Sequence, residues 1–169
     1  LQSPDKRTNV SITIGNDFLT YSVTQDDVII INDSPITMEL SDGKILGANP
    51  IVRNYDSKTV DKLIKAEFYK KEYIEDYYNE LTIRFKGNYN VEFRAYNDGV
   101  AYRFCTVFPK QITIVREGVF YNFEEDYTAH IPYVNKKRSE LDFFQKQLFN
   151  SFENTYTIEV AEWCNANNC

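Results

Sequence analysis

Short stretches of alternating apolar and polar residues, separated by turn residues, dominate the first half of this chain. Residues 10–14 read Val-Ser-Ile-Thr-Ile and residues 18–24 read Phe-Leu-Thr-Tyr-Ser-Val-Thr, with Gly15-Asn16-Asp17 between them. A repeat of two residues is the spacing of side chains on one face of a β-strand. Strands at such intervals, joined by turns, are typical of an antiparallel sandwich or barrel. The sequence therefore predicts an all-β fold, an antiparallel β-sandwich.

More strands are predicted further along the chain. Residues 28–31 are a continuous apolar run, Val-Ile-Ile-Ile, which is typical of a strand covered on both faces. Residues 32–35, Asn-Asp-Ser-Pro, are expected to end that strand. A hairpin is predicted over residues 111–123, around Glu117-Gly118. The other predicted strands are residues 36–40, 80–86, 89–96, 127–134 and 155–160.

Two segments have mixed patterns. Residues 55–78 combine a helical spacing with β-like aromatic pairs, and we expect one or two edge strands there. Residues 139–149 repeat apolar residues at helical spacing, so the chain is expected to hold at most one short helix. Because no repeat or linker divides the sequence, we expect a single domain over residues 1–169. The chain ends soon after a strand-like run, which favours a domain truncated at its C-terminal end.

The stretch 93–104, FRAYNDGVAYRF, is predicted to form a hairpin with Asp98-Gly99 at its tip. This register pairs Phe93 with Phe104 on an apolar face and places Arg94 opposite Arg103 on the other face. Like charges in that position repel, so Glu92 is the expected counter-ion. Two interpretations stay open: a solvated cluster of arginine and glutamate, or an arginine pair that binds a carboxylate or phosphate.

Charge and residue counts exclude several classes of function. Asp and Glu number 25 against 19 Lys and Arg, and the net charge of −6 argues against nucleic-acid binding. No apolar run approaches the ~18 residues that a membrane span needs. With the single histidine, His130, a histidine-based metal site or catalytic triad is not expected.

Three cysteines fit neither a disulfide framework nor a zinc site. Cys105 is expected to pack on the arginine face of the hairpin, and Cys164 and Cys169 could close a small loop in an oxidising compartment. The chain begins without Met, which is consistent with a removed signal peptide or with a fragment boundary. We expect a periplasmic or secreted protein.

Carboxylates are plentiful, but none forms a recognisable catalytic pair. Glu72, Glu75 and Asp76 form one cluster, and residues 124–126, Glu-Glu-Asp, form another. Glycoside hydrolysis needs one carboxyl group kept protonated beside an ionised partner, and clusters on loops are usually solvated. The chain is also rich in aromatic residues, with 13 Tyr, 12 Phe and 1 Trp. These residues suit a β-core, or a free-standing carbohydrate-binding β-sandwich that stacks Trp163 or exposed tyrosines on sugar.

Four stretches in this order resemble the N-terminal domain of glycoside hydrolase family 97. They are residues 3–6 (SPDK), 78–82 (YNELT), 93–104 (FRAYNDGVAYRF) and 126–132 (DYTAHIP). The family comprises α-glucosidases and α-galactosidases, best known from gut Bacteroidetes. The chain departs from the family pattern in offering Phe68 where many members have Trp.

This resemblance implies a β-super-sandwich of the galactose-mutarotase-like type, packed against a catalytic (β/α)8 barrel. The family's catalytic carboxylates and most of its sugar contacts lie on the barrel, which this chain does not contain. The chain would be non-catalytic by itself, would brace the barrel and would shape the rim of the active site. Oligosaccharide substrates would be met through the barrel, whose residues also decide between an inverting and a retaining mechanism.

The resemblance further implies a calcium ion in the intact enzyme, with one glutamate ligand from the N-terminal domain. Residues 151–156, SFENTY, resemble the family's aromatic-Glu-x-x-Tyr stretch, so Glu153 is the candidate ligand. Calcium takes about six to eight oxygen ligands, so one carboxylate is not expected to hold it in this chain alone. The alternative is that Glu153 is an exposed loop carboxylate.

Overall fold

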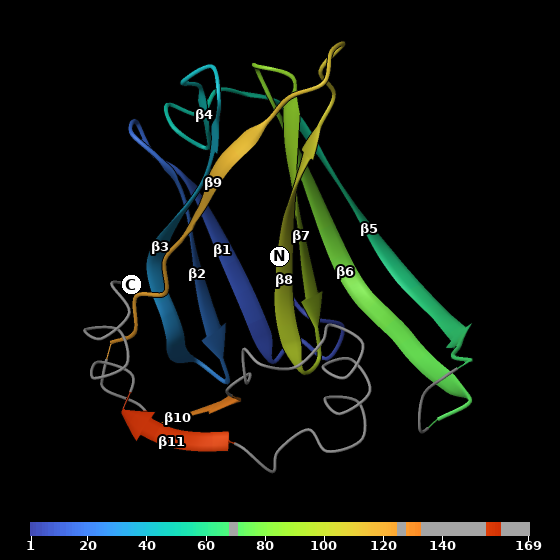
Figure 1. Ribbon diagram of the computed structural model, residues 1–169. Helices are drawn as coiled ribbons and strands as arrows, with labels where there is room; N and C mark the ends of the chain where they lie inside the picture. Colours follow the sequence, from blue (N-terminus) through green and yellow to red (C-terminus); the bar gives the residue numbers. More distant parts are fainter. Residues whose placement is uncertain (68–70, 125–127, 133–154, 160–169) are drawn as a thin grey trace, which may run out of the picture. The chain divides into compact units, whose positions relative to one another are not determined.

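The computed structural model describes residues 1–67, 71–124, 128–132 and 155–159, and every regular element among them is a β-strand (Figure 1). The chain divides into two compact units, Leu1–Glu124 and Glu125–Cys169, which are described separately. The first unit holds two antiparallel sheets. One sheet contains β1 (Thr8–Ile14), β2 (Leu19–Gln25), β3 (Val28–Leu40), β4 (Ile45–Leu46) and β9 (Ile114–Val119). The other runs in the order β5 (Val52–Lys65), β6 (Tyr73–Phe85), β7 (Tyr89–Tyr96) and β8 (Gly99–Thr106).

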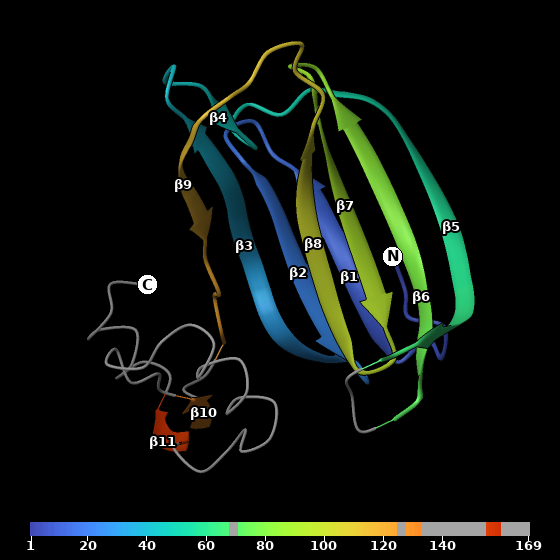
Figure 2. The ribbon, with the colours of Figure 1, turned by 45° about the vertical axis from the view of Figure 1, so that its right-hand side comes forward.

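The core of the first unit lies between these two sheets, whose strands run alongside one another in Figure 2. Leu19 and Ile36 from one sheet and Phe93 from the other are fully buried. Tyr21 connects the sheets, with its ring centroid 6.0 Å from that of Phe93 and 5.7 Å from that of Tyr102. The alternation seen in the sequence thus supplies two apolar inner faces, and the predicted all-β sandwich is confirmed.

The first two predicted turns are present. Gly15-Asn16-Asp17 lies between β1 and β2, and Asp26 and Asp27 join β2 to β3 with φ of 48° and 65°. Aspartate tolerates this left-handed conformation because its short polar side chain can hydrogen-bond locally. The pairing of β2 with β3 has register shifts between Tyr21 and Val23 and between Val23 and Thr24.

The prediction for residues 28–35 was wrong in two respects. The apolar run is not covered on both faces, since Val28 is 57% exposed and Ile30 is 37% exposed. The strand also does not end at residues 32–35, because β3 continues to Leu40 and there pairs with β4 and β9. The register shifts on β3 lie between Ile29 and Ser34, before Pro35, which pairs with Thr20. The hydroxyl of Ser34 accepts a hydrogen bond from the backbone N–H of Asn122 at 2.9 Å.

The hairpin of β7 and β8 is confirmed, but its register differs from the prediction. Asn97 and Asp98 form the tip, and Phe93 pairs with Tyr102. The side-chain oxygen of Asn97 accepts a hydrogen bond from the backbone N–H of Asp5 at 3.0 Å, which holds the tip in place. Because the pairing shifts by two residues on β8, every side chain keeps its predicted face. The arginines are therefore not opposite each other, and Arg103 instead lies opposite Glu92.

Residues 55–78 contain strands, as expected, namely most of β5 and the beginning of β6. The predicted hairpin over residues 111–123 was wrong. Gly118 is not at a turn but lies within β9, directly opposite Thr37 of β3, where the small residue leaves room for the threonine hydroxyl. The helix predicted over residues 139–149 lies outside the described residues.

The second unit contains β10 (Thr128–Pro132) and β11 (Thr155–Glu159), which pair antiparallel with Pro132 opposite Thr155. Both strands were predicted from the sequence. Among the described strands neither has a second partner, so Pro132 lies on a strand edge, where a proline is tolerated.

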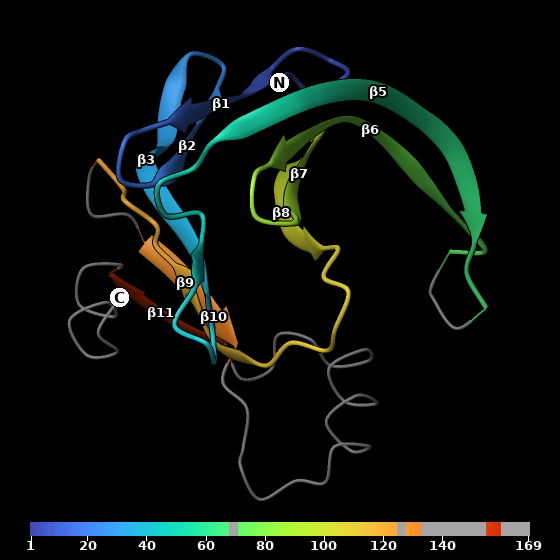
Figure 3. The ribbon, with the colours of Figure 1, turned by 90° about the horizontal axis from the view of Figure 1, so that it is seen from above.

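The β5–β6 hairpin extends beyond the rest of its sheet. Only residues 78–85 of β6 pair with β7, whereas residues 73–77 pair with residues 61–65 of β5 alone. Figure 3 shows these strands curving away from β7 and β8. We call residues 60–65 and 73–77 the ribbon.

Candidate functional site

Charged side chains form rows across the outer face of the second sheet, meaning the face that points away from the core. The central row consists of Lys58 on β5, Glu80 on β6 and Arg94 on β7, which the two strand registers place side by side. Lys58 Nζ lies 2.8 Å from Glu80 Oε1, and Arg94 Nε lies 2.8 Å from Glu80 Oε2. Each carboxylate oxygen of Glu80 thus has its own cation.

Glu80 is buried although it lies on the outer face, with only 3% of its surface exposed. The guanidinium carbon of Arg94 lies 4.3 Å from the centroid of the Tyr78 ring, so the arginine is held over the sheet beside the carboxylate. Burial by itself would raise the pKa of Glu80. The hydrogen bonds from Lys58 and Arg94 outweigh burial and hold that pKa below its usual value.

The neighbouring rows also pair opposite charges. Arg103 Nη2 lies 2.6 Å from Glu92 Oε2, and Lys62 Nζ lies 3.2 Å from Asp76 Oδ2. Arg84 likewise pairs with Asp56. Because Arg94 and Arg103 each bind a separate glutamate, they do not form a joint anion site, and the cluster of arginine and glutamate is the interpretation that the geometry supports.

These rows have the chemistry of a structural or binding surface. A catalytic acid needs a raised pKa, whereas Glu80 is held ionised between two cations. Among the described residues, no group of three or more His, Cys, Asp or Glu side chains could hold a metal ion. Of the acidic clusters noted in the sequence, Asp76 pairs with Lys62, and Glu125 and Asp126 lie outside the described residues.

Several predicted site residues cannot be placed on this surface. Glu153, Trp163, Cys164 and Cys169 lie outside the described residues. Cys105 is a free cysteine on the arginine face, as expected, where burial and a hydrogen bond with Glu92 raise the pKa of its thiol.

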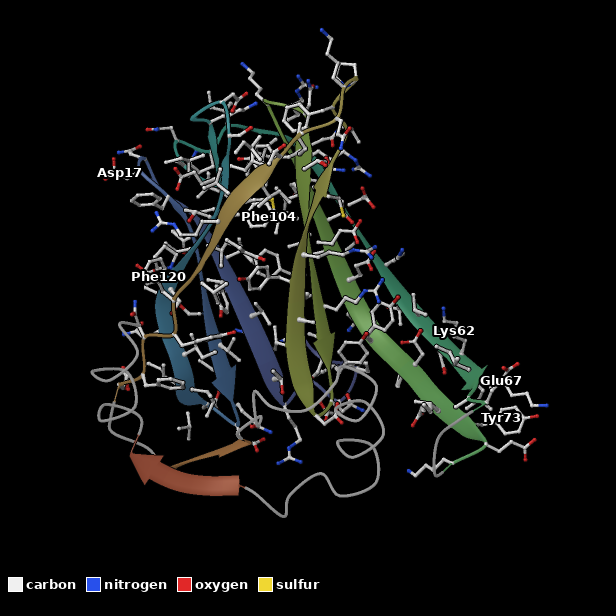
Figure 4. The ribbon with its side chains drawn as sticks, in the orientation of Figure 1. Asp17, Lys62, Glu67, Tyr73, Phe104 and Phe120 are labelled. Carbon is white, nitrogen blue, oxygen red and sulfur yellow. The ribbon has the colours of Figure 1, made fainter. Side chains whose placement is uncertain are left out.

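The ribbon exposes apolar side chains on both of its faces. Leu63 is 69% exposed and Tyr73 is 50% exposed, and Figure 4 shows Tyr73 near Lys62 and Glu67 at the far end of β5 and β6. Ile64 and Ile74 are direct cross-strand partners on the outer face, and both are exposed. This projection was not predicted from the sequence, although the β-like character of residues 55–78 was the signal for it.

A groove of about 520 Å³ lies beside the base of β5. It is lined by β1 residues, including Ile12 and Ile14, and by Val52 and Tyr55 of β5. Tyr55 is 73% exposed, so the inner face of β5 is open to solvent there. The groove contains no paired carboxylates and offers an apolar surface.

No helix among the described residues has the length and hydropathy needed to cross a membrane.

Comparisons with known proteins agree with this architecture. The family model described as "Glycosyl-hydrolase 97 N-terminal" matches residues 1–167. A retaining alpha-galactosidase of Bacteroides thetaiotaomicron is 45% identical over 159 residues, which cover 94% of this chain and 24% of that protein. The chain therefore spans about a quarter of the length of this relative.

Solved structures share the fold. A glycoside hydrolase family 97 enzyme from Pseudoalteromonas sp. strain K8, in complex with acarbose, matches with a TM-score of 0.68 and 22% identity over 79% of this chain and 22% of that one. A beta-arabinopyranosidase matches with a TM-score of 0.69 and 21% identity over 82% of this chain and 23% of that one. Together with the family match over nearly the whole sequence, the sandwich identifies this chain as a member of the glycoside hydrolase family 97 N-terminal domain family.

Proposed function

We propose that this chain is the non-catalytic N-terminal portion of an α-glycosidase, and that its role is to brace the catalytic barrel and shape the rim of the active site. The observation that carries this proposal is the ribbon. An exposed apolar cross-strand pair, Ile64 and Ile74, lies at the end of a projection that no other described strand covers. Together with the exposed Leu63 and Tyr73, this pair gives the ribbon an apolar surface that is available for contact with another domain.

The bracing role is tested in the full-length protein with Ile64→Thr and Ile74→Thr. Threonine keeps the branched shape that favours a strand but removes apolar contact area. We expect both variants to lower the thermal stability of the full-length protein and to reduce glycosidase activity. Val28→Thr is the matched control, because Val28 is an exposed branched residue on the other sheet. Ribbon variants that behave like the control would refute the bracing role.

We propose α-galactosides as the substrate class and a retaining mechanism, and the support for both is the relative, a retaining alpha-galactosidase. Both properties would belong to the catalytic domain. The test is hydrolysis of nitrophenyl α-galactoside and α-glucoside by the full-length protein, with the anomeric form of the first product read by NMR. Preference for the glucoside, or inversion at the anomeric carbon, would contradict this part of the proposal.

A calcium role for Glu153 remains part of the proposal. The support is the resemblance of residues 151–156 to the family's aromatic-Glu-x-x-Tyr stretch, by which Glu153 would supply one ligand and the catalytic domain the others. Glu153→Gln in the full-length protein should weaken calcium binding, measured by calorimetry after chelation. Unchanged calcium affinity would remove Glu153 from the site.

The second hypothesis, a free-standing carbohydrate-binding module, predicts that the chain itself binds glycans and loses this binding with Trp163→Ala.

We further propose a periplasmic or secreted location. Cell fractionation with an antibody to the chain tests the location directly.

A further inference from the structure

The unpaired edge of β5 is the longest such edge in its sheet. β5 is the terminal strand of the order β5-β6-β7-β8, and no other described strand pairs with its outer edge. Figure 3 shows β5 on the outside of the curved sheet. A long edge with unsatisfied N–H and C=O groups is a ready site for another strand.

The residues that present these groups can be identified from the β5–β6 hairpin. The backbone N–H of Ala66 donates to the carbonyl oxygen of Glu72 at 2.8 Å, so Ala66 bonds toward β6. The register runs without a shift from Asn54 to Lys65. Because bonding direction alternates along an antiparallel strand, the odd-numbered residues from Tyr55 to Leu63 direct their N–H and C=O groups outward.

Two copies of β5 can pair antiparallel with complementary side-chain charges. When the two-fold axis between the copies passes through Thr59, Asp56 of one copy lies opposite Lys62 of the other, and this pair occurs twice. The same register places the exposed Tyr55 opposite the exposed Leu63. It also brings outward-directed residues opposite one another, as hydrogen bonding requires.

Other two-fold registers are less favourable. An axis at Lys58 places that lysine against its own copy, and an axis at Val60 places Lys58 against Lys62. Like charges directly opposite each other are destabilising. An axis at Ser57 leaves Leu63 without a partner and extends the pairing into the irregularity between Val52 and Asn54. Charge repulsion thus disfavours the axes at Lys58 and Val60. The axis at Ser57 would also pair opposite charges, Asp56 with Lys58, and it is disfavoured by the irregular pairing between Val52 and Asn54.

We propose that two copies of this chain associate through their β5 strands, which pair antiparallel about a two-fold axis at Thr59. The two β5–β8 sheets then form one continuous sheet. Asp56 and Lys62 already contact Arg84 and Asp76 within the chain, but their side chains are 54% and 57% exposed and remain accessible to the second copy. The contact is isologous, as in most homodimers. It uses the edge of β5 with Tyr55 and Leu63, whereas the proposed contact with the catalytic domain uses the outer-face pair Ile64 and Ile74.

Cross-linking in the full-length protein tests the axis. Residues in a hydrogen-bonded antiparallel pair have Cα atoms about 5.5 Å apart, within the range of about 4.4 to 6.8 Å that a disulfide spans. Thr59→Cys should therefore form a disulfide-linked dimer under mild oxidation. Ser57→Cys is the matched control, because the two copies of residue 57 would lie roughly 14 Å apart along the strands. The wild type under the same oxidant measures the background from natural cysteines.

A charge exchange tests the same contact without relying on cysteine. Asp56→Lys and Lys62→Asp should each raise the dimer dissociation constant about tenfold, measured by sedimentation, because two complementary pairs become two like-charged pairs. The double variant should restore the wild-type value. Asp26→Lys is the control, since Asp26 is similarly exposed and ion-paired to Arg7, and lies in the turn between β2 and β3, away from β5.

The proposal is overturned by a full-length protein that stays monomeric at high concentration, by a dimer that is insensitive to both charge variants, or by cross-linking of Ser57→Cys in place of Thr59→Cys. Selective cross-linking at Thr59 together with rescue by the double variant establishes it.

Discussion

Glu80 shows how a carboxylate can be buried on the outer face of a sheet. Its two oxygens are matched by Lys58 and Arg94, and the aromatic ring of Tyr78 supports the arginine. Glu80→Gln should lower the free energy of unfolding by about 1–2 kcal/mol, because the charged hydrogen-bond acceptor is lost. The loss is limited because the partners Lys58 and Arg94 are partly exposed to water. Urea denaturation followed by circular dichroism measures this change.

Glu92→Gln is the control for that substitution. Glu92 also pairs with an arginine, but its partner Arg103 is 62% exposed, so the pair is well screened by water. We expect a smaller loss of stability than for Glu80→Gln. Equal losses would mean that burial does not strengthen the central row.

The lowered pKa of Glu80 makes its contribution depend on pH. Because hydrogen bonds from Lys58 and Arg94 hold the pKa of Glu80 below the usual glutamate value of 4.5, the folded protein favours the ionised carboxylate. This stabilisation is complete above pH 4.5 and is lost as the pH falls through the lower pKa of the folded state. The difference in stability between the wild type and Glu80→Gln should therefore shrink in acid. A difference that grows as the pH falls would contradict the assigned direction.

At the scale of single elements, two glycines with similar backbones give a matched pair of substitutions. Gly47 and Gly43 have φ of +86° and +83°, a region that costs other residues about 1–2 kcal/mol. A Cβ on Gly47 would lie 2.3 Å from the carbonyl oxygen of Ile36, whereas a Cβ on Gly43 would meet no atom within 4 Å. Gly47 also accepts a hydrogen bond from the backbone N–H of Leu19 at 2.8 Å.

Gly47→Ala should therefore destabilise the chain by about 3 kcal/mol, and Gly43→Ala by about 1 kcal/mol. Thermal melts of the two variants, recorded in parallel, give the comparison. Equal losses of stability would mean that the backbone moves to relieve the contact between the new Cβ and the carbonyl oxygen of Ile36 without any loss of free energy of unfolding.

The strands show which parts of the fold the sequence could predict. Alternation and turn residues were sufficient for β1, β2 and β7, since each strand has one buried face. The register of the β7–β8 hairpin could not be predicted, because the bond between Asn97 and Asp5 connects residues distant in sequence. The same is true of β9, whose glycine resembles a turn but fits against Thr37.

The candidate site was predictable only in part. The sequence indicated that arginine and glutamate gather on one face of the hairpin, but it did not identify Lys58 or Glu80. Their row depends on the long pairing of β5 with β6, and residues 55–78 have no clean alternation from which to read it. The family resemblance came from an ordered set of short stretches, and the match over residues 1–167 confirms it.

At the scale of the whole first unit, tyrosines between the two sheets make its stability sensitive to alkaline pH. Burial raises the pKa of Tyr21 to about 12, from the usual tyrosine value of 10.0. The pKa values of Tyr89 and Tyr102 are raised in the same direction, also mainly by burial. The folded state therefore keeps these phenols protonated at a pH where the unfolded chain would ionise them.

Above pH 10 the unfolded state binds fewer protons than the folded state, so stability falls as the pH rises toward 12. We expect phenolate absorbance to increase in two steps, with the second step coinciding with loss of the circular dichroism signal. Tyr21→Phe keeps the ring between the sheets but removes one of these phenols, so its stability should fall less steeply with pH. A wild-type protein whose tyrosines all ionise before it unfolds would show that the phenols reach water without separation of the sheets.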